Sequence, residues 1–150
     1  MDINFRPAVL EDISGILKFM KNFYGISSYP FDEKKNEEPL RDLINNENLG
    51  RLWIIEFNSG AVGYMILAFG YSIEYKGRDA FIDELFIEEE FRGKGIGKAA
   101  MNFVVNEARK LGINAVHLEV ERDNEAAKNL YLKNNFKDNG RTLMTRWIER

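Results

Sequence analysis

Residues 81–98, FIDELFIEEEFRGKGIGK, decide the fold. The first seven are apolar apart from two carboxylates, which predicts a buried strand, and a short acidic turn leads from them into a basic loop. That loop, residues 92–98, carries three cations and three glycines and opens into a predicted helix. Because unpaired N–H groups and the helix dipole favour negative charge there, the stretch predicts a site for a phosphorylated ligand.

Length and composition limit the remaining possibilities. The 150 residues are 45% hydrophobic and 30% charged, which predicts one globular domain, residues 1–150. The absence of cysteine excludes disulfides and thiolate sites, and with a single histidine we expect no metal site. A net charge of −3 argues against a nucleic-acid partner. The first residues contain no long apolar run, so we expect no signal peptide, no membrane partner and a cytoplasmic location.

The hydrophobic pattern predicts an α/β fold with the element order β-α-α-β-β-β-α-β-α-β, in which helices flank both faces of a central mixed sheet. The predicted strands are residues 2–6, 51–57, 61–71, 80–87, 115–120 and 142–148, and the predicted helices are 13–24, 39–46, 96–111 and 124–133. Residues 58–60 predict a hairpin and 25–32 a loop, and Pro39 is expected only in a first helical turn. Strands 80–87 and 115–120 should be parallel, joined by a right-handed crossover.

Two common phosphate-binding motifs do not fit the basic loop. A Walker A motif has four residues between its glycines and a hydroxyl residue after its lysine. Here three residues separate Gly93 from Gly97, and Ala99 follows Lys98. A dinucleotide-binding fingerprint would require a glycine where Lys98 stands, in the first βα unit of the chain. Both readings are therefore excluded.

The sequence R-G-x-G-I-G at residues 92–97, between a predicted strand and a predicted helix, resembles the pyrophosphate loop of the GNAT superfamily of acetyl-CoA-dependent N-acetyltransferases. Downstream, Asn124, Tyr131 and Phe136 resemble the Asn…Tyr segment and the Y-x-x-x-G-F ending of that family, with Asn135 in the glycine position. Asparagine tolerates the left-handed conformation, so this departure is mild. The resemblance covers about residues 2–148 and is strongest over 81–136, although a plain glycine-rich turn would explain the loop alone.

The resemblance implies acetyl-CoA as cosubstrate. The backbone of the basic loop would hold its diphosphate, and its pantetheine arm would lie between splayed strands, 81–87 and 115–120. A main-chain N–H near Ile87 would polarise the thioester carbonyl. The residues expected to bind the cosubstrate are Leu85, Phe86, Ile87, Arg92, Gly93, Lys94, Gly95, Ile96, Gly97, Lys98, Asn124 and Tyr131.

The resemblance also implies catalytic groups. Tyr131 stands where the family carries its general acid, and a phenol is a suitable proton donor to a leaving thiolate; the alternative is a core aromatic. An alkylammonium acceptor must lose a proton before it attacks, so a carboxylate base is expected. The candidates, in order of preference, are Glu84, Glu119 and Asp83, and each has an ion-paired or strand-end carboxylate as its alternative. Strand alternation places Asp83 and Glu84 on opposite faces.

The first half of the chain would select the acceptor. Its aromatic and acidic residues suit a cation, so we predict a primary amine on a small cationic molecule such as a polyamine or amino sugar. A protein or peptide amine is the nearest alternative. A different function, a non-catalytic acetyl-CoA-binding sensor or regulatory module, stays open, although Tyr131 and the strand carboxylates argue against it. The sequence leaves acyl-chain preference and assembly undecided, a homodimer included.

Overall fold

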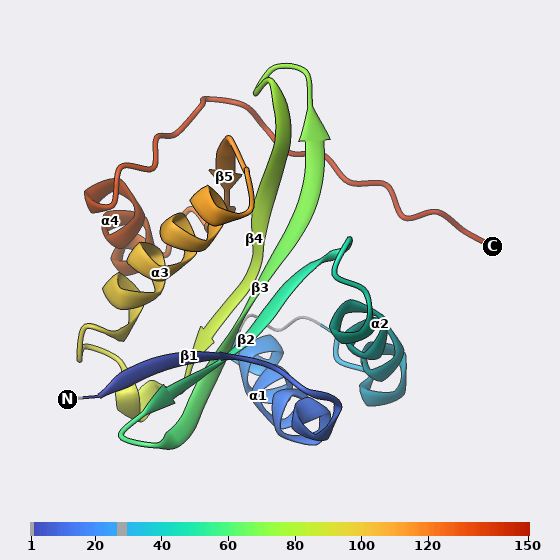
Figure 1. Ribbon diagram of the computed structural model, residues 1–150, viewed down its shortest axis with the longest axis vertical. Helices are drawn as coiled ribbons and strands as arrows, with labels where there is room; N and C mark the ends of the chain where they lie inside the picture. The colour runs from blue at the N-terminus through green and yellow to red at the C-terminus, as the bar shows by residue number, and fades with distance from the viewer. Residues whose placement is uncertain (1, 27–29) are drawn as a thin grey trace.

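A five-stranded sheet in the order β1-β2-β3-β4-β5 forms the centre of the molecule in this computed structural model, which describes residues 2–26 and 30–150 (Figure 1). The strands are β1 (Ile3–Pro7), β2 (Gly50–Phe57), β3 (Gly60–Ser72), β4 (Gly77–Ile87) and β5 (Ala115–His117). The first four pair antiparallel, and β4 pairs with β5 in parallel. The parallel pair is connected through α3 (Ile96–Lys110), which confirms the predicted crossover unit.

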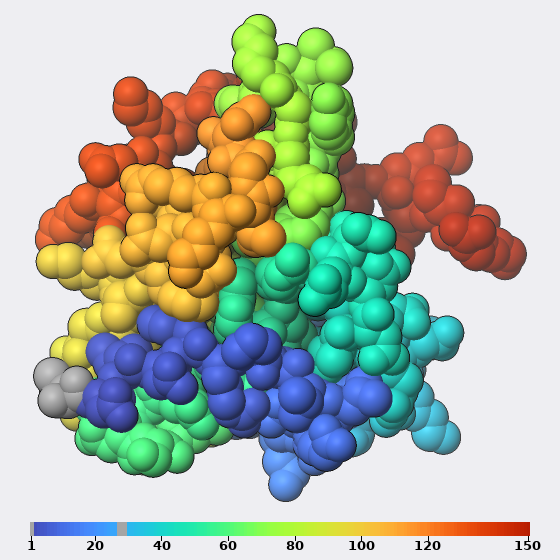
Figure 2. All heavy atoms as spheres, viewed as in Figure 1, coloured from blue at the N-terminus to red at the C-terminus, as the bar shows by residue number. Residues whose placement is uncertain are grey.

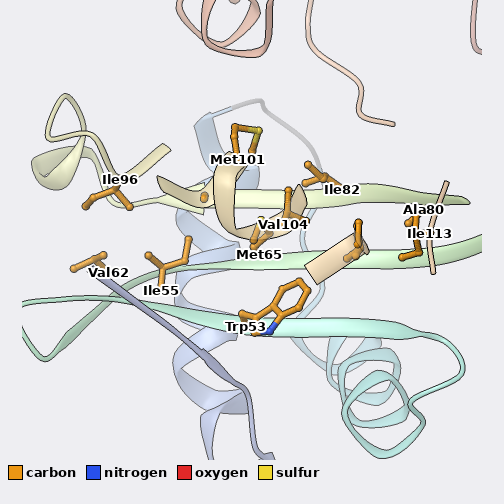
Figure 3. Close-up of a cluster of buried hydrophobic side chains, with 13 residues drawn as sticks. Trp53, Ile55, Val62, Met65, Ala80, Ile82, Ile96, Met101, Val104 and Ile113 are labelled. Atoms are coloured by element: carbon orange, nitrogen blue, oxygen red, sulfur yellow. The ribbon is translucent and has the colours of Figure 1, made fainter. Parts of the chain in front are cut away.

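Helices cover both faces of the sheet. The helices α1 (Ile13–Ile26) and α2 (Glu33–Asn45) pack on one face, and α3 and α4 (Glu125–Lys133) pack on the other; the short 3-10 turns are η1 (Leu10–Asp12) and η2 (Glu89–Phe91). Each face of the sheet carries its own hydrophobic core, one under α3 and one under α1 and α2. Alternate residues of β2 enter these two cores, because successive strand side chains point to opposite faces. Figure 3 shows the core on the α3 side, with Met101 and Val104 lying over Met65 and Trp53. None of the helices in the described residues is both long and apolar enough to cross a membrane.

Several local predictions are confirmed. Asn58 and Ser59 adopt left-handed φ values of 50° and 72° in the tight turn between β2 and β3, as a two-residue hairpin requires. The side chain of Asn124 caps α4 by accepting the N–H of Ala127 at 3.2 Å. Asn135, just past α4, has a φ of 68°, the left-handed conformation expected of it.

The prediction for the second helix was wrong at its start. The carboxylate of Asp32 accepts the N–H of Lys35 at 3.2 Å and so caps α2. The helix begins at Glu33, six residues before the predicted start, and Pro39 therefore lies inside it. Pro39 removes one helical hydrogen bond, but the buried side chain of Leu40 holds this part of α2 against the sheet. The predicted loop 25–32 includes residues 27–29, which lie outside the described residues, and α1 continues to Ile26.

Two strand predictions near the C-terminus were also wrong. The strand β5 ends at His117 rather than at residue 120, and residues 142–148 form no strand. The observed order is therefore β-α-α-β-β-β-α-β-α. An apolar, β-branched run predicts a strand, but a strand forms only where an edge is available to pair with it. The segment 141–150 runs past the sheet without pairing to it, and all its residues are exposed.

Candidate active site

A β-bulge in β4 positions the two adjacent carboxylates. Glu84 pairs with Ile66 of β3 and Ile82 pairs with Leu67, so Asp83 is an extra residue without a direct partner on β3. Before the bulge, even-numbered residues of β4 enter the core under α3, and after it they enter the core under α1. The bulge therefore turns Glu84 towards α1, a reversal that simple alternation along the strand does not predict.

Two tyrosine hydroxyls hold the carboxylate of Glu84. Tyr24 of α1 donates to Oε2 at 2.5 Å, and Tyr64 of β3 donates to Oε1 at 2.7 Å. Burial raises the pKa of Glu84, the two hydroxyl donors oppose that rise, and the charge of Asp83 adds to it. Burial and the charge of Glu84 raise the pKa of both tyrosines, so both stay protonated donors. This arrangement yields a fixed, partly desolvated carboxylate able to accept a proton.

Tyr64 is the residue of this group that sequence reasoning missed. It is 0% exposed and pairs with Phe86 across β3 and β4, which makes it a diagonal neighbour of Glu84 on the same face. The hairpin register together with the bulge would have identified it. The bulge, however, leaves no sequence signal of its own.

The other candidate catalytic residues lie at separate places around β4. Asp83 reaches solvent, yet neighbouring protein atoms desolvate its carboxyl group enough to raise its pKa. Glu119 is exposed and lies in the segment after β5. Tyr131 packs against the core under α3, its ring is 6.0 Å from that of Phe136, and burial raises its pKa. Tyr131 and Glu84 thus approach the sheet from opposite faces.

The edge of β4 opens where β5 ends. The two strands pair only at Asp79–Ala115, Ala80–Val116 and Phe81–His117, whereas β4 continues to Ile87. Among the described residues, no strand pairs with residues 82–87 on that side. Unpaired peptide groups along this edge can hydrogen-bond to an extended ligand, as an added strand would.

The basic loop presents backbone N–H groups at the start of α3. Gly93 and Gly95 adopt left-handed φ values of 76° and 84°, and nothing lies within 4 Å of a Cβ built on either residue. The first-turn N–H groups of α3 have no helical partner, and the buried side chain of Ile96 anchors them. A Cβ on Gly97 would come within 3.0 Å of Leu130, so α4 packs closely against the same turn. An open, cationic cradle of this kind fits a diphosphate.

The cations of the loop differ in orientation. Lys94 and Lys98 are exposed, so both are accessible to an anion from solution. Arg92 instead lies back over the end of β4, where its Nε donates to the carbonyl oxygen of Ile87 at 2.9 Å and its guanidinium lies 5.8 Å from the ring of Phe86. Arg92 therefore covers the end of β4, which leaves the backbone N–H groups and the two exposed lysines as the groups available to an anion.

A cavity of about 930 Å³ adjoins this region. It is lined by the C-terminal end of α1, including Lys21, and by Phe86, Glu88, Glu89, Glu90 and Arg92. The three glutamates outnumber the two cations, Lys21 and Arg92, so the wall of the cavity has a net negative charge. A larger groove, of about 1090 Å³, lies elsewhere, between α3, β5 and the segment after α4.

Residues 17–136 match the model of the acetyltransferase (GNAT) family, which covers most of the chain, including the loop and α4. The chain belongs to this family. It is accordingly an acetyl-CoA-dependent N-acetyltransferase, as the resemblance implied. The individual role of each candidate site residue stays a prediction.

Curated relatives and solved structures agree with the family. A thialysine N-epsilon-acetyltransferase from Bos taurus is 34% identical over 86% of this chain and 81% of its own length. An uncharacterised N-acetyltransferase from Methanocaldococcus jannaschii is 26% identical over 89% of this chain, which spans 60% of that relative. Among solved structures, an integron cassette protein from a salt-marsh metagenome has a TM-score of 0.86 at 28% identity, over 97% and 91% of the two chains.

A solved structure of a predicted acetyltransferase from Clostridium acetobutylicum was determined with acetyl-CoA. It has a TM-score of 0.81 to this chain at 23% identity, over 97% of this chain and 96% of its own. At that identity the likeness establishes the shared GNAT fold, with its mixed sheet between two layers of helices.

Proposed function

We propose that this enzyme transfers an acetyl group directly from acetyl-CoA to the primary amine of a small cationic molecule, with Glu84 as base and Tyr131 as acid. The observation that carries the proposal is the half-buried Glu84 carboxylate, held by two tyrosine hydroxyls beside the open edge of β4. A carboxylate in a mostly apolar strand is costly unless it is paired or useful, and here no cation pairs with it among the described residues.

The amine must reach the thioester as a free base. An alkylammonium group has a pKa near 10.4, so at neutral pH a nearby acceptor has to take its proton. Glu84 takes that proton, directly or through a water molecule, and its raised pKa makes it a better base than an exposed carboxylate. Tyr24 and Tyr64 fix both oxygens of the carboxylate during this step.

The other residues hold the cosubstrate and its leaving group. The N–H groups of residues 93–98 bind the diphosphate, and the open edge of β4 binds the extended arm that follows it. As the nitrogen forms its bond to the acetyl carbon, the carbon–sulfur bond breaks, and Tyr131 gives its proton to the departing sulfur. The products are an N-acetylated amine and the free thiol. Of the two protons that the ammonium group loses, one passes through Glu84 to solvent and the other restores the hydroxyl of Tyr131.

The acidic cavity supports a cationic acceptor. Its volume lies in the range of small-molecule sites, and its three glutamates outnumber its two cations, which suits an ammonium group. Three of the curated relatives are named for the Nε-acetylation of thialysine, which favours a small amine over a protein. Release of free thiol from acetyl-CoA, measured with thialysine, polyamines, amino sugars and short peptides, tests this. We expect the highest kcat/KM with a small cation; turnover of peptides alone would overturn the assigned acceptor.

Substitution Tyr131→Phe tests the acid. Positioned acids contribute about 10²- to 10⁴-fold, so kcat should fall by at least about 100-fold while the affinity for coenzyme A is unchanged. Tyr71→Phe is the matched control, because Tyr71 is 78% exposed on β3. An unchanged kcat in Tyr131→Phe would assign Tyr131 to the core alone. If the wild-type protein binds coenzyme A but turns over none of the amines, the sensor function replaces the transferase function.

A further inference from the structure

One lysine of the chain lies in the acidic cavity of about 930 Å³ that the proposed function gives to the acceptor. Lys21, near the end of α1, lines this cavity together with Phe86, Arg92 and the glutamates of residues 88–90, and its side chain is exposed. On the face that Figure 2 shows, the C-terminal end of the chain stands away from the body of the molecule and leaves α1 uncovered. The protein therefore carries a primary amine of its own where the amine of a substrate is expected.

The amine of Lys21 is not fixed by a partner. Among the described residues no ion pair includes Lys21, although three glutamates line the same cavity. By contrast, Lys110 of α3 contacts the carboxylate of Glu107 at 3.3 Å. An amine that is attracted by several carboxylates and held by none keeps its freedom to move on its flexible stem within the cavity.

The groups that would activate an amine lie close to Lys21. It precedes Tyr24 by three residues, so the two side chains are neighbours on the surface of α1. Tyr24 donates to the carboxylate of Glu84, and Glu84 lies about 7 Å along β4 from Phe86, on the same face after the bulge. The stem of a lysine carries its nitrogen about 6 Å from the backbone. The amine can therefore move from the cavity wall towards Glu84.

The cavity also adjoins the end of β4 where the thioester is expected. We expect the thioester carbonyl near Ile87, the last residue of β4, and the cavity is lined by the residues on either side of it, Phe86 and Glu88. The exposed lysines of the basic loop lie at the diphosphate end, so the whole pantetheine arm would separate their amines from the acetyl group. Among the described residues, Lys21 is the lysine that lines this cavity.

We infer that Lys21 is a self-acetylation site and that its acetylation makes the cavity a better site for a cationic acceptor. The inference rests on the proposed function. The ammonium group of Lys21 loses a proton through Glu84 to solvent, its nitrogen bonds to the acetyl carbon, and the carbon–sulfur bond breaks. Tyr131 gives its proton to the departing sulfur, and the second proton lost by the nitrogen restores its hydroxyl. The products are Nε-acetylated Lys21 and free coenzyme A.

Acetylation changes the charge of the cavity wall. Before it, three glutamates face two cations, Lys21 and Arg92, and afterwards they face Arg92 alone. The internal ammonium group also no longer competes with an external one for the same carboxylates. Removing one like charge about 4 Å away changes an affinity by about 5-fold in water, and by more in a less polar site. A cationic acceptor should therefore bind at least about 5-fold more tightly to the acetylated protein.

Intact-mass spectrometry tests the modification. When the protein is incubated with acetyl-CoA alone, we expect it to gain one acetyl group, assigned to Lys21 by peptide mapping, at a first-order rate that does not change on dilution. Lys21→Arg should abolish the gain, and Glu84→Gln should slow it at least about 100-fold. Lys18→Arg is the matched control and should react like wild type, because Lys18 is exposed one turn earlier on α1 and does not line the cavity.

The other outcomes of this experiment separate the inference from the proposed function. Acetyl groups spread over many lysines, at the rate seen in the urea-unfolded chain, would be a chemical background and would overturn the inference. If added amines are turned over while Lys21 stays unmodified, the inference is wrong and the proposed function stands. If neither Lys21 nor any added amine is acetylated, both are wrong.

Calorimetry tests the effect on the acceptor site. With coenzyme A present, Lys21→Gln, which lacks the charge as acetyl-lysine does, should bind spermidine at least about 5-fold more tightly than Lys21→Arg, which keeps it. Lys18→Gln and Lys18→Arg should not differ from each other. Equal affinity of the two Lys21 variants, or no binding of spermidine to either, would overturn the effect assigned to acetylation.

Discussion

Substitution Tyr64→Phe tests the Glu84 site without touching the acceptor. Tyr64 is 0% exposed, so its hydroxyl acts on the reaction only through Glu84, to which it donates at 2.7 Å. The phenylalanine ring can keep the packing against Phe86, whose centroid is 6.1 Å away. The variant therefore removes one hydrogen bond to the carboxylate and little else.

The size of the effect follows from the hydrogen bond. Donation to a charged group stabilises it by about 1.5–3 kcal/mol, and 1.36 kcal/mol corresponds to one pKa unit. The pKa of Glu84, already raised by burial, should rise by a further one to two units, approximately, in Tyr64→Phe. Because the base acts in its ionised form, the acidic limb of the kcat/KM profile should move to higher pH by the same amount.

The assay is kcat/KM for acetyl transfer across pH, with Tyr71→Phe as control. At pH values well below the acidic limb, kcat/KM of the variant should be about 10- to 100-fold lower than that of wild type. At high pH the kcat/KM of the variant should return to the wild-type value. Stability gives an independent readout. Below the ordinary carboxyl pKa of 4.5 Glu84 is protonated in both folded and unfolded chains, so the two proteins differ least there. The extra instability of the variant should appear only as pH rises through the raised pKa of folded Glu84, where the wild-type carboxyl ionises before that of the variant. An unmoved limb with a uniform loss of rate would refute Glu84 as the base.

Two further substitutions test the loop and the strands around it. Gly95→Ala puts a side chain on a residue with a φ of 84° and should cost about 1–2 kcal/mol of stability; coenzyme A should bind more weakly by calorimetry. Gly112→Ala, at a φ of 70° beyond α3, should cost similar stability and leave that affinity unchanged, and equal affinities in both variants would remove the loop from the site. Gly63→Ala would place a Cβ 1.9 Å from the carbonyl oxygen of Phe86 and should lower the free energy of unfolding by more than about 2 kcal/mol in denaturant titrations. Gly60→Ala, whose nearest contact is 3.8 Å, should change it by less than about 0.5 kcal/mol; similar losses at the two sites would contradict the close strand approach.

Local patterns were sufficient for most of the fold. The helix over residues 96–110 follows from a regular apolar stripe, and the β2–β3 hairpin from the turn residues between two β-branched runs. The cap at Asn124 and the left-handed Asn135 were predictable because each depends only on neighbours along the chain. The start of α2 also has a local cause, since the cap at Asp32 depends only on Lys35, three residues further along the chain. The prediction instead began the helix at Pro39 and did not consider Asp32 as a cap.

Features that depend on distant partners could not be predicted. The early end of β5 and the unpaired residues 142–148 reflect which edges are available, and the sequence does not state this. The same holds within the site. Glu84 was identified as the preferred base from its place in a strand, but its contact with Tyr64 depends on the bulge at Asp83 and on the β3–β4 register.

The central claim is that the N–H groups at the start of α3 bind the diphosphate of acetyl-CoA beside the open edge of β4. Isothermal titration of the purified protein with coenzyme A tests it most directly. We predict saturable binding of one molecule per chain, with affinity falling as salt is raised because charge contributes to it. A titration that shows neither heat nor saturation, with a protein shown to be folded by circular dichroism, would contradict the claim.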